Sequence, residues 1–220
     1  MDKITHLPRL AHIKNFPPNP IQMFKSILER VKAPHIFPMN LATLDNEFGV
    51  LNRTVIYRGL LDDSWICFVT ERNSRKYQNL KENPKLGLTI LFHPDARKVE
   101  TKEILPETWQ IRLLNAEAVE LNDDQLKVLW QQEPLLAKIR SHICSCGKPN
   151  STEELESRFE EQLAIMDREK REPEQTKSYT AFKIIPKYWD FYMSEPDAIA
   201  DRVQYKQLES GEWQAYHVDA

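Results

Sequence analysis

Residues 37–70 read FPMNLATLDNEFGVLNRTVIYRGLLDDSWICFVT, and this stretch decides the fold class. It contains three short segments that are rich in β-branched and aromatic residues: Phe37–Leu44, Asn52–Leu60 and Trp65–Thr70. Short runs of Asp, Asn, Ser and Gly separate the segments, and these residues favour turns. The stretch therefore predicts an antiparallel meander of three strands.

The rest of the chain adds strands and helices to this meander. An irregular, proline-rich arm at 1–20 precedes an amphipathic helix at Ile21–Val31. Ser74 is expected to cap a helix that runs to Glu82, and two more helices are expected at 122–140 and at 151–170. Further strands are expected at Lys85–Phe92, Trp109–Leu121, Tyr179–Ile185, Tyr188–Tyr192, Arg202–Leu208 and Trp213–Val218.

The order of these elements lacks the β–α–β alternation of a parallel sheet. It predicts a mainly β chain with flanking helices (α+β), built as an antiparallel barrel. We expect a single domain over 1–220, with an N-terminal arm and helix at 1–36 and a helical insertion at about 122–170.

Composition excludes several classes of protein. The chain has 30 Lys+Arg and 33 Asp+Glu, a net charge of −3, which argues against a nucleic-acid partner. No apolar run approaches the ~20 residues of a membrane span, and Met1–His6 lacks the apolar core of a secretory signal. Three cysteines cannot form a closed disulfide framework, so we expect a reducing, cytoplasmic location.

The five glycines are isolated, so the sequence has neither a dinucleotide-binding Gly-x-Gly-x-x-Gly fingerprint nor a P-loop. A phosphate-bearing ligand would have to be held by side chains. Ser74-Arg75-Lys76 combines a hydroxyl and two cations at a predicted helix start, which suits a phosphate. The alternative is a solvated first turn of the helix.

The other candidate residues can also be explained without a ligand or a metal. Arg53 and Arg58 fall on opposite faces of one strand, where arginine is commonly exposed. His142, Cys144 and Cys146 have poor spacing for a structural zinc site, so incidental thiols are the better interpretation, with redox sensing left open.

One ordered set of motifs resembles a known family. The set comprises Arg53-x-Val55, Phe68-Val69-Thr70, Ser74-Arg75-Lys76, Asn83-Pro84, Glu107–Arg112 and Asp201-Arg202. It resembles the pyridoxamine 5′-phosphate oxidase-like family of FMN-binding proteins, and specifically its oxidase-related branch. The resemblance implies an antiparallel split β-barrel of the FMN-binding type and a homodimer with FMN at the interface.

By position, the resemblance implies a set of cofactor-binding residues. These are Arg53, Val55, Arg58, Val69, Thr70, Ser74, Arg75, Lys76, Gln110, Tyr192 and Arg202. Arg58 replaces a family Lys that touches flavin and substrate, and Tyr192 falls where the family often has Trp.

The substrate side departs from the family pattern. The oxidases of vitamin B6 synthesis carry Arg-x-His before Asp-Arg, and here both positions are alanine, Ala198 and Ala200. Glu133 lies near where a substrate-phosphate cation is expected, and a carboxylate there would repel a phosphate. We therefore expect an FMN-dependent oxidoreductase acting on another small molecule, without a named catalytic acid or base. The alternatives are a genuine pyridoxamine/pyridoxine 5′-phosphate oxidase with an altered site, a non-catalytic flavin-binding module, and a fold-level likeness without flavin.

Overall fold

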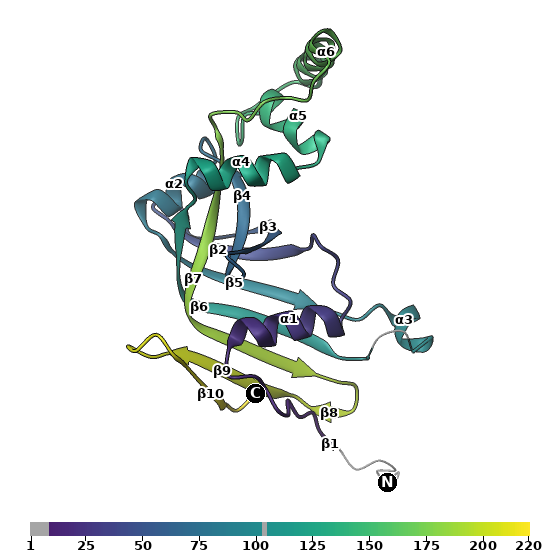
Figure 1. Cartoon of the computed structure of the whole chain (residues 1–220), viewed down its shortest axis with the longest axis vertical. Coiled ribbons are helices and arrows are strands. Elements are labelled where there is room, and N and C mark those ends of the chain that lie inside the picture. The colour runs from purple at the N-terminus through teal and green to yellow at the C-terminus, as the bar shows by residue number, and fades with distance from the viewer. Residues whose placement is uncertain (1–8, 103–104) are drawn as a thin grey trace.

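The computed structural model describes residues 9–102 and 105–220. Six antiparallel strands close into a barrel in the order β2–β3–β4–β7–β6–β5 and back to β2 (Figure 1). They are β2 (Pro38–Asp45), β3 (Gly49–Leu61), β4 (Trp65–Glu71), β5 (Lys85–Phe92), β6 (Thr108–Glu120) and β7 (Tyr179–Ser194). The predicted meander and the mainly β barrel with flanking helices are confirmed.

Strand β7 organises the C-terminal half. It pairs with β4 over 179–183 and with β9 (Asp201–Gln207) over 188–193, and β10 (Trp213–His217) completes a hairpin with β9. The prediction of two separate strands here is wrong because Pro186 does not end the strand. Pro186 lies in the interval between the two partners of β7, a place where a residue without an N–H is tolerated.

Six helices flank the barrel in the described residues. They are α1 (Pro20–Arg30), α2 (Arg75–Glu82), α3 (Ala96–Glu100), α4 (Asp123–Gln132), α5 (Leu135–Ile143) and α6 (Thr152–Glu169). The single helix predicted at 122–140 is wrong, because Glu133 is extended and separates α4 from α5. Pro134 explains the break, since a residue before proline is disfavoured in the helical conformation. None of the helices in the described ranges is long and apolar enough to cross a membrane.

The predicted arm is partly ordered by pairing. Its residues 9 and 10 form β1 (Arg9–Leu10), which runs parallel to β8 (Ala198–Ile199). Residues 1–8 of the arm lie outside the described part of the chain.

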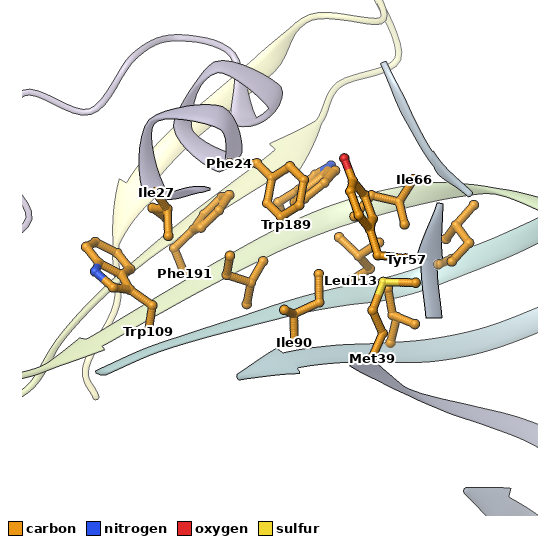
Figure 2. Packing of buried hydrophobic residues seen from close by; sticks show 14 of the residues in the cluster. Phe24, Ile27, Met39, Tyr57, Ile66, Ile90, Trp109, Leu113, Trp189 and Phe191 are labelled. Atoms are coloured by element: carbon orange, nitrogen blue, oxygen red, sulfur yellow. The ribbon is translucent and has the colours of Figure 1, made fainter. Parts of the chain in front are cut away.

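Helix α1 packs its apolar side onto the barrel. Phe24 is fully buried, with its ring centroid 5.5 Å from Trp189 and 6.0 Å from Tyr57. Figure 2 shows Phe24 and Ile27 pointing from the helix toward aromatic side chains of the sheet. The helix predicted at Ile21–Val31 is thereby explained: its apolar residues complete the barrel core.

Candidate functional site

A pocket of about 240 Å³ lies between β3, β4, the start of α2 and the end of α5. Five of the residues predicted to bind a cofactor line it: Val55, Arg58, Val69, Thr70 and Lys76. These residues come from β3, β4 and α2, which follow one another in the chain, and β3 pairs directly with β4. The pocket is therefore the candidate functional site.

Ser74 orders the pocket wall at the start of α2. Its hydroxyl accepts a hydrogen bond from the Tyr77 N–H at 3.3 Å, which caps the helix as predicted. The same hydroxyl lies 2.9 Å from Thr70 Oγ1, and Lys76 Nζ donates to Thr70 Oγ1 at 3.2 Å. The buried hydroxyl pair of Ser74 and Thr70 therefore caps the start of α2 and also holds the Lys76 ammonium in place.

Ser74→Ala should lower the free energy of unfolding by about 1 kcal/mol, the usual cost of losing a helix cap. For a chain of this size the melting temperature should fall by roughly 3 °C. Ser157→Ala, at an exposed position on α6, is the matched control and should change stability by less than about 0.5 kcal/mol. Equal melting temperatures for the two variants in a thermal scan would contradict the assigned cap.

Three cations surround the start of α2. Lys76 and Arg140 line the pocket, whereas Arg53 does not line it and donates to Thr43 Oγ1 at 2.5 Å. Burial lowers the pKa of Lys76, and the charges of Arg53 and Arg140 lower it further, while Cys146 and Glu71 act in the opposite direction. Within the described ranges none of the three cations forms an ion pair with a carboxylate. The pocket therefore favours an anion, which would relieve this repulsion.

Glu71 contributes the opposite charge to the same pocket. Its side chain is almost fully buried, and among the described residues its Oε2 has no hydrogen-bond partner. A buried carboxylate oxygen without a partner suits a ligand that offers O–H or N–H groups. Sequence reasoning missed both Glu71 and Arg140, because neither stands in a motif.

Arg75 does not face the pocket. Its Nε and Nη2 donate to the two oxygens of Asp45 at 2.7 and 3.1 Å, and it also pairs with Glu47. Its guanidinium lies 4.4 Å over the ring of Phe48. This pairing holds the pKa of Asp45 well below its usual value. Arg75 thus fastens α2 to the β2–β3 turn.

Three predicted site residues form a second group. Gln110, Tyr192 and Arg202 are direct cross-strand neighbours on β6, β7 and β9. They point away from the core, because the adjacent residues Trp109 and Phe191 fill the barrel interior (Figure 2). This group does not line the pocket described above.

A buried carboxylate compensates Arg58. Glu133 is only 6% exposed and accepts from Arg58 Nε at 2.9 Å and Nη2 at 3.1 Å. The Tyr179 hydroxyl donates to the same carboxylate at 3.4 Å. Glu133, the acid that the sequence placed near the expected substrate phosphate, is therefore present. Its negative charge is paired with Arg58 at the pocket wall.

The segment that holds the two alanines of the substrate side pairs with the N-terminal arm. Ala198 pairs with Arg9, and Asp201 accepts a hydrogen bond from the Ile13 N–H at 2.7 Å. The arm thus contacts this segment directly.

His142 is separated from the neighbouring thiols. Its Nε2 donates to the Glu174 carbonyl at 2.8 Å, whereas Cys144 and Cys146 line the pocket. The described part of the chain holds no cluster of three or more His, Cys, Asp or Glu side chains suited to a metal ion.

The closed barrel and its helices define the class: an antiparallel split β-barrel like those of FMN-binding proteins. No family model matches the chain. Curated relatives named pyridoxine/pyridoxamine 5′-phosphate oxidase include that of Idiomarina loihiensis, 25% identical over 199 residues, covering 88% of this chain and 86% of the relative. That of Bordetella pertussis is 25% identical over 193 residues, covering 86% and 83%.

Two solved structures share the fold. PhzG from Burkholderia lata, solved with tetrahydrophenazine-1-carboxylic acid, has a TM-score of 0.75 at 17% identity, covering 97% of this chain and 100% of that one. A pyridoxamine 5′-phosphate oxidase-related, FMN binding protein from Nostoc punctiforme has a TM-score of 0.67 at 18% identity, covering 90% and 96%. The chain is therefore similar in sequence to proteins named pyridoxine/pyridoxamine 5′-phosphate oxidase, and the resemblance seen in its motifs is confirmed.

Proposed function

We propose that this protein binds FMN at the pocket beside α2 and is an FMN-dependent oxidoreductase. The observation that carries the proposal is that Lys76 and Arg140 line one pocket and neither has a carboxylate partner among the described residues, while the charge of Arg53 also acts on Lys76. These cations suit the phosphate of FMN, and the unpartnered oxygen of Glu71 suits a hydroxyl of its sugar-alcohol chain. The sequence relatives and the fold neighbour from Nostoc support the same cofactor.

The chain's own contribution would be binding and orientation. Bound FMN would supply a two-electron acceptor for a small-molecule donor. Thr70 and Ser74 hold Lys76 in place, and Arg58 with Glu133 forms a neutral pair at the pocket wall.

A second copy of the chain would complete the site. Gln110, Tyr192 and Arg202 were expected to bind the cofactor, yet they lie on the outer face of the barrel, apart from the pocket. In a homodimer that packs by this face, the group from one copy can meet the pocket of the other. Leu91 supports this arrangement, since it pairs with Gln110 and is 57% exposed on the same face.

The substrate proposed is not a pyridoxine phosphate ester. Glu133 neutralises Arg58, and Ala198 and Ala200 offer no hydrogen-bonding side chain at the positions of the oxidase Arg and His. Among the described residues, a phosphate dianion would therefore meet Arg58 already paired with Glu133 on this side of the site.

The test combines a spectrum with one activity assay. After incubation with FMN and desalting, the protein should retain a flavin absorption spectrum. With pyridoxine 5′-phosphate it should release no more hydrogen peroxide than free FMN does. Loss of all flavin on desalting would overturn the proposal, and rapid peroxide release would establish the genuine oxidase instead.

A further inference from the structure

The thiols of Cys144 and Cys146 form part of the pocket wall, and the proposed FMN binding assigns them no role. Cys144 ends α5 and is partly exposed, and Cys146 lies two residues further in an exposed turn. Both line the pocket that Lys76 and Arg140 also line. The third cysteine, Cys67, is buried and only 1% exposed.

The spacing of the two cysteines permits a bond between them. Cα atoms two residues apart are separated by at most roughly 7 Å. Disulfides span Cα distances of roughly 4.4 to 6.8 Å. Cys144 is extended, and the turn that follows it is closed by Lys148 N–H donating to the Ser145 carbonyl, with a positive φ at Gly147 (73°), so Cys146 lies within this turn.

The ends of this turn are fixed by α6. Arg158 donates to the Ile143 carbonyl at 2.9 Å and to Asn150 Oδ1 at 2.5 Å. These two hydrogen bonds lie on either side of residues 144–149 and hold the thiols at the pocket. The short stretch of backbone between the two thiols can still shorten. The Cys144 N–H also donates to the Arg140 carbonyl at 3.0 Å, so the backbone of Cys144 is joined to the last turn of α5, which carries Arg140.

We propose that Cys144 and Cys146 form a peroxide-reactive dithiol whose oxidation to an intramolecular disulfide changes this pocket. One sulfur attacks the O–O bond of hydrogen peroxide, giving a sulfenic acid and releasing the other oxygen as water. The second thiol then attacks the sulfenic sulfur, forming the S–S bond and releasing a second water. Two thiols thus lose two electrons and two protons, and the peroxide is reduced to two waters.

Cys67 is the internal control for this chemistry. Burial raises the pKa of its thiol to about 11, and it lies within the barrel wall on β4. Both conditions suppress its reaction with peroxide. The proposal therefore predicts selective oxidation of two of the three cysteines.

The experiment is intact-mass spectrometry of the FMN-free full-length protein under non-reducing conditions. Stoichiometric hydrogen peroxide should remove two hydrogens per chain, reversibly with dithiothreitol, and peptide mapping should place the link between residues 144 and 146. Cys67→Ser should react like the wild type. Cys144→Ser and Cys146→Ser should each stop at a sulfenic acid that dimedone traps.

Three outcomes would overturn the proposal. They are an unchanged mass, a disulfide that includes Cys67, or a bond between two chains. Because the reaction is followed without FMN, a failure of the proposed flavin site leaves this result unaffected. If the disulfide forms, phosphate binding measured by calorimetry should be weaker for the oxidised protein than for the reduced one, and equal affinities would contradict the coupling through Arg140.

Discussion

Lys76→Ala is expected to lower the affinity for FMN by roughly 30- to 150-fold, which corresponds to the loss of about 2–3 kcal/mol from one charge-assisted contact. Lys76 faces the pocket and is held there by Thr70. The free-energy cost of removing Lys76 from water is already included in the folding of the protein. A bound anion therefore gains the full attraction of the lysine ammonium.

Arg75→Ala is the matched control for this prediction, because it removes the neighbouring cation of the same motif. Arg75 is turned to Asp45 and Glu47, so its loss should leave FMN affinity within about threefold. Titration of each variant by flavin fluorescence measures both affinities, and Lys76→Arg should retain most of the binding. A larger loss for Arg75→Ala than for Lys76→Ala would contradict the placement of the phosphate.

Asp190→Asn is expected to lower the free energy of unfolding by about 3 kcal/mol and the melting temperature by roughly 10 °C. Asp190 is fully buried and accepts hydrogen bonds from Arg112, Arg202 and Gln204. The amide leaves two guanidinium groups without their anion. Because both arginines are partly exposed, the effect should lie at the lower end of the range for broken buried ion pairs.

The same contacts predict a pH dependence. Burial acts to raise the pKa of Asp190, but the hydrogen bonds from Arg202, Gln204 and Arg112 hold it below its usual value. The carboxylate therefore stabilises the fold above the pKa of an unfolded Asp, about 3.9, and this contribution is lost as the pH falls further. The difference between wild type and Asp190→Asn should shrink below about pH 4.

Asp124→Ala provides the control, since Asp124 pairs with Lys127 at the surface. Exposed pairs contribute little, so chemical denaturation should show a change below about 1 kcal/mol. If Asp190→Asn is no less stable than Asp124→Ala, the buried cluster does not hold β6, β7 and β9 together.

The elements that the sequence predicted well are those with local signals. Ser74 caps α2 as expected, and the strands of residues 37–70 follow from their β-branched segments and turns. The two strands predicted at Tyr179–Ile185 and Tyr188–Tyr192 form one strand, because Pro186 would end it only where the N–H that it lacks was needed. That depends on which strands lie beside β7, and these are distant in sequence.

The candidate site was predictable only where a motif carried it. Lys76 came from the cation-rich helix start and Thr70 from the resemblance, and the structure brings them to one pocket. Arg75 belongs to the same tripeptide, but its direction is decided by Asp45, 30 residues away. Arg140 is one of several charged helix residues, so only the packing of α5 beside β3 and β4 identifies it.

We propose that two copies of this chain share each flavin. Sedimentation velocity, recorded at the flavin absorption band after FMN loading, tests it most directly. We predict that the flavin signal sediments entirely with a dimer, and that Tyr192→Ala and Arg202→Ala lower the bound flavin although neither residue lines the pocket of its own chain. A flavin signal that sediments with the monomer, or that stays with free FMN, would contradict the account.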